Sequence, residues 1–65
     1  MEKVFSVAVF LPNGVVQSYI VDQNCEWGNV SHIYISSNPL VVKVHCEQRT
    51  LFYAGTPFLA QEKTT

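Results

Sequence analysis

The segment from Val4 to Leu11 would place apolar side chains on both sides of any strand that it forms. Side chains alternate between the two faces of a strand. One face would carry Phe5, Val7, Val9 and Leu11, and the other Val4, Ala8 and Phe10. An antiparallel strand with one face in water usually alternates apolar and polar residues. This strand therefore has to be covered on both faces, either because the sheet curls into a small barrel or because a second subunit packs on it.

A hairpin is predicted around Pro12-Asn13-Gly14, because a second strand-like run, Val15 to Val21, follows at once. Proline favours the first corner of a type I turn, and glycine accepts the left-handed conformation after it. Two registers are open. A two-residue turn would pair Ala8 with Tyr19, whereas a three-residue turn with a bulge would pair Val7 with Tyr19, and the choice decides which side chains share a face.

Three further strands are expected in the second half of the chain, at 31–36, 40–46 and 51–54. The first two alternate clearly, with Ile33 and Ile35 predicted to face the core, and His32, Tyr34 and Ser36 the solvent. Residues 22–29 form a polar connection in which we expect one helical turn ending at Gly28.

The end of the chain has the signals of a helix start, with Thr56 as the N-cap and Pro57 at the first helical position. We therefore predict a short C-terminal helical turn over 58–63. The fold class is mostly β, a small five-stranded antiparallel meander or an SH3-like barrel, the latter compared in size and strand number only. Residues 1–60 are expected to form a single β domain, and residues 61–65 a frayed tail.

The charged fraction is low, 14% of residues, against about 25% in an average soluble domain. Depletion of charge is a property of protein–protein interfaces, although a surface of Ser, Thr, Asn and Gln would also account for it. The net charge is −1, and the cations Lys3, Lys43, Arg49 and Lys63 are scattered. Nucleic-acid binding is disfavoured, because phosphate contacts need clustered cations.

A cytoplasmic protein with reduced cysteines is expected. The longest apolar run, Val4 to Leu11, is far too short to cross a membrane as a helix. The first residues also lack the basic start and the cleavage site of a signal peptide. A disulfide between Cys25 and Cys46 is possible by number alone, but a reducing compartment argues against it.

No metal, cofactor or catalytic residue is predicted. The two cysteines together with His32 and His45 would complete a zinc shell by type, but His45 and Cys46 are adjacent in a strand and point to opposite faces. The carboxylates are all placed at termini or turns: Glu2, Asp22, Glu26, Glu47 and Glu62. No acid–base pair or glycine-rich phosphate loop is present, so we expect no enzyme.

The aromatic and histidine residues of the sheet and its connection are the candidate interaction surface: Tyr19, Trp27, His32, Tyr34 and Tyr53. The preferred hypothesis is a protein-binding module, either a homodimer or a small regulator or inhibitor of a larger protein. A chain of this kind is common among proteins of phages and mobile elements, which is the origin that we expect. The alternative is a small barrel that binds single-stranded nucleic acid through Tyr34, His32 and Lys43.

Overall fold

The computed structural model describes residues 2–62, with only the backbone of Glu2, and over this range it consists of strands and their connections. The strands are β1 (Glu2–Val4), β2 (Ser6–Phe10), β3 (Val16–Ile20), β4 (Asn24–Cys25), β5 (Gly28–Ser37), β6 (Leu40–Cys46), β7 (Thr50–Ala54) and β8 (Phe58–Gln61). The prediction of a mostly β, antiparallel fold is confirmed. Nowhere between residues 2 and 62 does a helix have the length and apolar character needed to cross a membrane.

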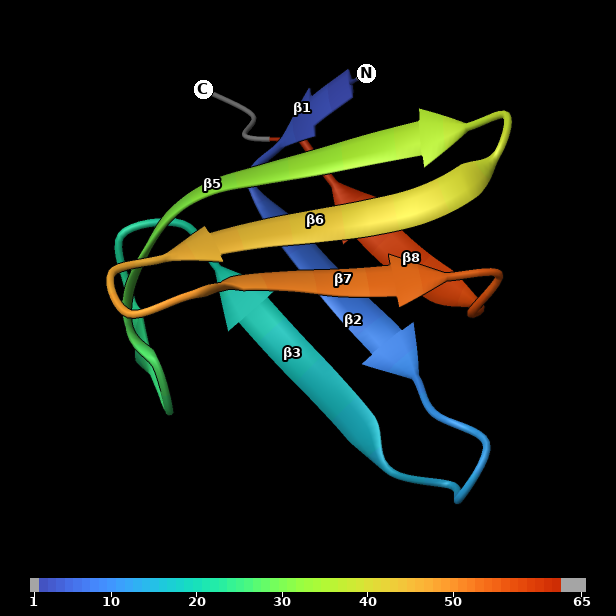
Figure 1. Ribbon diagram of the computed structural model, residues 1–65, viewed down its shortest axis with the longest axis horizontal. Helices are drawn as coiled ribbons and strands as arrows, with labels where there is room; N and C mark the ends of the chain where they lie inside the picture. Colours follow the sequence, from blue (N-terminus) through green and yellow to red (C-terminus); the bar gives the residue numbers. More distant parts are fainter. Residues whose placement is uncertain (1, 63–65) are drawn as a thin grey trace.

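The strands form two sheets that lie one over the other, with their strands crossing obliquely (Figure 1). The first sheet has the order β1-β5-β6-β7, with β4 also paired to β5, and the second has the order β3-β2-β8. The consecutive hairpins β5-β6-β7 are the predicted meander. The predicted count of five strands is too low, because the ends of the chain and the connection after β3 add short strands of their own.

One bend at Phe5 lets the first apolar segment serve both sheets. The N–H of Phe5 donates to the carbonyl of Gln61 (2.9 Å), and the carbonyl of Phe5 accepts from the N–H of Val21 (2.9 Å). Because the bend interrupts the alternation, Val4 and Val7 both face the core. The prediction that Val4 shares a face with Ala8 and Phe10 is therefore wrong.

The hairpin between β2 and β3 has the three-residue turn. Val7 lies opposite Tyr19, which confirms the bulged register over the tighter one. The N–H of Gly14 donates to the carbonyl of Leu11 (3.0 Å), and Gly14 has a φ of 86°, as expected for the left-handed residue after a type I turn. The side chain of Asn13 closes the loop by accepting from the N–H of Val15 (3.0 Å).

The helical turn predicted before Gly28 is wrong, because this segment folds back as a tight hairpin. Cys25 of β4 pairs with Gly28 at the start of β5. The N–H of Asp22 donates to the carbonyl of Val30 (2.8 Å), and the N–H of Val30 donates to the carbonyl of Gln23 (3.0 Å). These bonds satisfy the backbone more completely than a single isolated helical turn could.

The C-terminal helical turn is also wrong, since the segment forms β8 along the free edge of β2. Phe58 lies opposite Val9, and the N–H of Phe10 donates to the carbonyl of Pro57 (2.9 Å). A helix of six residues gains little by itself, whereas an unpaired edge offers a row of partners. Gln61, the first residue of the predicted frayed tail, ends β8, and residues 63–65 of that tail lie outside the described residues.

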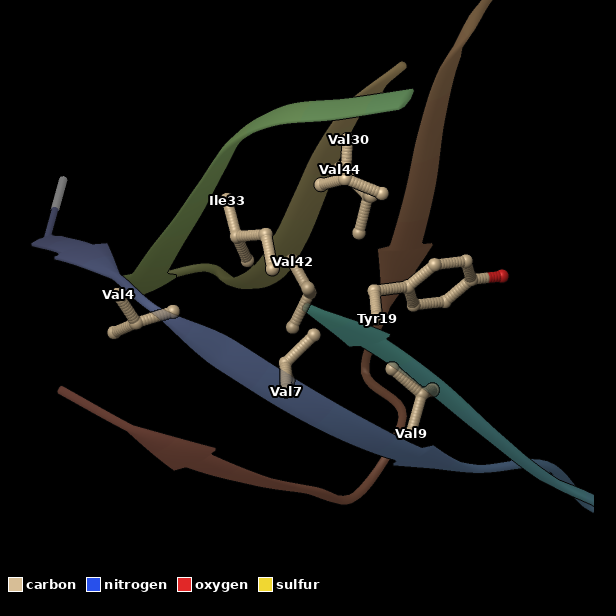
Figure 2. Packing of buried hydrophobic residues seen from close by; sticks show 8 residues of the cluster. All are labelled: Val4, Val7, Val9, Tyr19, Val30, Ile33, Val42 and Val44. Atoms are coloured by element: carbon tan, nitrogen blue, oxygen red, sulfur yellow. The ribbon is translucent and has the colours of Figure 1, made fainter. Parts of the chain in front are cut away.

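The core lies between the two sheets and takes side chains from both (Figure 2). Its members are almost all β-branched: Val4, Val7, Val9, Tyr19, Val30, Ile33, Val42 and Val44. The sheets do not close into a barrel, because β3 and β7 are both terminal strands. Instead, the hydroxyls of Tyr19 and Tyr53 share a hydrogen bond of 2.6 Å across this opening. The structure is thus an open two-layer fold rather than the alternative SH3-like barrel.

Candidate functional site

Among the side chains of residues 3–62, none that is charged lies on the outer surface of the second sheet. By register, the residues that point away from the core are Ser6, Ala8, Phe10, Val16, Ser18, Ile20, Leu59 and Gln61, which we call the uncharged face. Three of its large apolar side chains are well exposed: Phe10 at 38%, Val16 at 50% and Leu59 at 67%. Single exposed apolar residues are ordinary, but several on one face without a charge are typical of an interaction site.

The uncharged face is hollowed near its centre. Short side chains from neighbouring strands lie side by side there, since Ala8 is opposite Ser18 on β3 and opposite Leu59 on β8. A shallow depression results, lined among others by Ser6, Ile20 and Leu59. Small residues at the centre with larger ones at the rim leave space for a projecting side chain of a partner.

The outer surface of the first sheet has a different character. Four residues follow one another across β1, β5, β6 and β7, because Lys3 is opposite Tyr34, Tyr34 opposite Lys43, and Lys43 opposite Phe52. We call these four residues the Lys–aromatic row. The Nζ atom of Lys43 lies 5.5 Å from the centre of the Phe52 ring, within the range of a cation–π interaction.

A cluster of rings lies beside this row. His32 stacks on Tyr34, with centroids 5.8 Å apart and planes inclined by 10°, while His45 meets both rings edge-on. A β-bulge between Val30 and His32 leaves Ser31 as the extra residue of β5, and bulges re-aim neighbouring side chains. The hydroxyl of Ser31 donates to the carbonyl of His45 (3.1 Å) and lies 3.1 Å from Nδ1 of His32.

The residues predicted to form one interaction surface are divided between separate places. His32 and Tyr34 lie together on the outer face of the first sheet, as the alternation predicted. Tyr19 is only 7% exposed and points into the core opening toward Tyr53. Burial, followed by the hydrogen bond to Tyr53, raises the pKa of the Tyr19 phenol above its ordinary range. Trp27 is half-buried in the turn after β4, with the guanidinium of Arg49 4.5 Å from its ring centre.

Cys25 and Cys46 are both half-buried, and their Sγ atoms lie 3.5 Å apart as free thiols. The N–H of Trp27 also lies 3.4 Å from Sγ of Cys25, to which it donates. Burial, together with the hydrogen bond to Cys25, raises the pKa of the Cys46 thiol to about 11. His45, in contrast, lies on the outer face. Within residues 2–62, no three or more His, Cys, Asp or Glu side chains lie close enough together to hold a metal ion.

Two exposed residues, Leu59 and Phe52, were not identified as surface residues from the sequence. Leu59 was placed in a helix, and only the pairing of β8 with β2 shows that it faces solvent. Phe52 alternates with the inward-facing Leu51 and Tyr53, so the pattern of its own strand could have identified it as outward. The apolar pair Ala8 and Phe10 was the signal that did point to the uncharged face.

No family model, curated protein or solved structure matches the chain. The function is therefore argued from the geometry of these surfaces.

Proposed function

We propose that the protein is a non-enzymatic protein-binding module that docks through the uncharged face. The observation that carries this proposal is the exposure of Phe10, Val16 and Leu59 on a sheet surface where the described part of the chain places no charged side chain. Burying charged groups in an interface is costly unless each finds a partner. A surface free of them can be covered by an apolar partner without this penalty, while removal of apolar area from water stabilises the complex.

The partner that we propose is a second copy of the chain. In a two-fold symmetric dimer the same surface lies on both sides of the interface, so an uncharged face meets no like charge when it packs on itself. In such a dimer, the Leu59 side chain of each copy would enter the depression at Ala8 and Ser18 of the other copy. A small regulator or inhibitor would use the same face on a larger protein with an apolar surface.

The dimer should be weak, because the face is small. Strands lie about 4.8 Å apart and rise about 3.4 Å per residue, so three strands of up to five residues give a footprint of about 14 by 17 Å. Stable specific interfaces bury about 800 Å² of surface on each partner, which exceeds what this footprint alone offers. We therefore place the contact in the transient class. The reducing cytoplasm, where Cys25 and Cys46 would stay free thiols, is the compartment that we propose.

Sedimentation velocity over a wide concentration range tests the proposal. The wild-type protein should show a monomer–dimer equilibrium, and Leu59→Glu, which introduces a charge into the uncharged face, should be monomeric throughout. Phe52→Glu is the matched control, since Phe52 is 63% exposed, close to the 67% of Leu59, but lies on the other sheet. A wild-type protein that stays monomeric at the highest concentration would contradict the dimer, as would equal effects of the two substitutions.

A further inference from the structure

We propose that the outer face of the first sheet binds single-stranded nucleic acid along the Lys–aromatic row. This surface is separate from the uncharged face and adds a second binding activity to the module. The proposal rests on the alternation of cation, ring, cation and ring across four neighbouring strands, Lys3, Tyr34, Lys43 and Phe52.

The spacing of the row suits both the base and the phosphate of a nucleotide. Adjacent strands are about 4.8 Å apart, so the rings of Tyr34 and Phe52, which are two strands apart, are separated by roughly 10 Å, and the same holds for the two lysines. Proteins that bind single strands without sequence preference combine ring platforms for the bases with cations for the backbone. The row places one cation beside each ring.

The rings are accessible and held in place. Phe52 is 63% exposed, with the ammonium group of Lys43 over it. Tyr34 is half-buried and supported from one side by the stacked ring of His32 and from another by the edge contact with His45. The ring of His45 is fixed in turn by a hydrogen bond of 3.3 Å between its Nδ1 atom and the hydroxyl of Thr50. Rings that are already fixed lose little conformational entropy when a base stacks on them.

The local charge is complementary to a polyanion even though the net charge is −1. Among the side chains of residues 3–62, the carboxylates belong to Asp22, Glu26, Glu47 and Glu62, which lie in turns or after β8 rather than on β1, β5, β6 or β7. Glu47 is further occupied as the acceptor for the N–H of Asn29 (2.6 Å). None of these carboxylates therefore belongs to a strand of the Lys–aromatic row, although Asp22 lines a depression together with Lys3 at one end of it.

A single strand is favoured over the other occupants that a sheet face could take. An apolar protein surface would have to desolvate two lysines without offering them a partner. Base pairs in a duplex hide the ring faces, so stacking on Tyr34 and Phe52 requires unpaired bases. Two lysines neutralise about two phosphates, which predicts a weak interaction whose salt dependence has a slope of about −1.4, since a single strand contributes roughly 0.7 per phosphate.

Fluorescence anisotropy with a labelled oligothymidylate at low salt tests the proposal, with a duplex of the same length as competitor. We expect the single strand to bind and the duplex to compete poorly. Phe52→Ala should weaken binding by about 5- to 140-fold, which corresponds to 1–3 kcal/mol for one stacked base. Lys43→Gln should reduce the salt slope by about 0.7.

Val15→Ala is the control, because it removes an exposed apolar side chain that belongs neither to the uncharged face nor to the Lys–aromatic row. Circular dichroism should show that Phe52→Ala and Val15→Ala are both folded, since neither side chain is buried. Absence of binding at low salt would overturn the proposal. The same holds for a duplex that competes as well as the single strand, or for equal losses with Phe52→Ala and Val15→Ala. Because this assay reports on nucleic acid and sedimentation on self-association, failure of one proposal is distinguishable from failure of the other.

Discussion

Cys25 and Cys46 come from strands on different parts of the chain, 21 residues apart in sequence, and bring their Sγ atoms to 3.5 Å. Both cysteines are free and half-buried, so each thiol lies within reach of the other and is still partly accessible to an oxidant. This pair is placed for reversible oxidation to a disulfide, which the number of cysteines alone did not decide.

Oxidation with glutathione disulfide should convert the pair into an intramolecular disulfide. Each thiol loses one hydrogen, the two sulfurs form a bond, and the glutathione disulfide is reduced to two molecules of glutathione. Closing a loop of this length should raise the free energy of unfolding by about 3 kcal/mol. Mass spectrometry and denaturation with and without a reductant measure both effects. Cys25→Ser should abolish the change, and a mixed disulfide with glutathione as the sole product would contradict the expectation.

The free energy of unfolding should fall at alkaline pH. In the folded protein the pKa of Cys46 is raised from 9.0 to about 11, so between these values the native state holds a proton that the unfolded state has lost. This stabilisation is complete below about pH 9 and is lost as the pH rises through about 11. Tyr19, whose pKa is raised as well, adds to the loss at still higher pH.

Urea denaturation of the reduced protein at a series of pH values measures this dependence. Cys46→Ala should flatten the stability curve between about pH 9 and pH 11, whereas Tyr19→Phe should affect mainly its most alkaline part. A stability that is constant over this range in the wild-type protein would show that the thiol is not buried against Cys25 as described.

Val9→Ala should destabilise the protein by about 2 kcal/mol, because Val9 is 0% exposed and loses both its transfer energy and its packing contacts. Val16→Ala is the matched substitution on the neighbouring strand, where the side chain is 50% exposed, and should change stability by no more than about 0.5 kcal/mol. Thermal unfolding compares the two. Similar losses at both positions would mean that a partner already covers the uncharged face, or that β2 is turned by one residue.

Gly28→Ala should cost more than Gly14→Ala, although both glycines have positive φ, 95° and 86° respectively. Both substitutions carry a backbone penalty of about 1–2 kcal/mol. At Gly28 the new Cβ would also lie 2.9 Å from Cβ of Glu47, whereas at Gly14 no atom lies within 4 Å. Chemical denaturation of the two variants gives the difference. Equal losses would indicate that the hairpin of β6 and β7 moves away from Gly28 without cost.

The parts of the fold that depend on local pattern followed from the sequence. Ile33 faces the core as its alternation predicted, and the Pro12-Asn13-Gly14 turn is present. Tyr19 was assigned to the candidate interaction surface as an aromatic residue while the register of that turn was open, and the register observed puts it opposite the buried Val7. A difference of one residue in a turn thus decided whether a tyrosine is a surface or a core residue.

The surfaces were less predictable, because they depend on pairing between distant strands. The Lys–aromatic row exists only because β1 pairs with β5, which brings Lys3 beside Tyr34. No local signal indicates this pairing. Thr56 and Pro57 did carry a local signal, for a helix, but the free edge of β2 outweighed it. Leu59 consequently lies on the uncharged face.

The bend at Phe5 has a consequence for how the molecule unfolds. Since one continuous segment, Glu2 to Phe10, supplies a strand to each sheet and both sheets share one core, neither sheet can detach without exposing the interior of the other. Backbone amides of β2 and β5 should then exchange with solvent only through complete unfolding. Their free energies of opening should therefore be the same in both strands. The two sheets therefore unfold as one cooperative unit, so a destabilising change on either outer surface lowers the stability of both sheets.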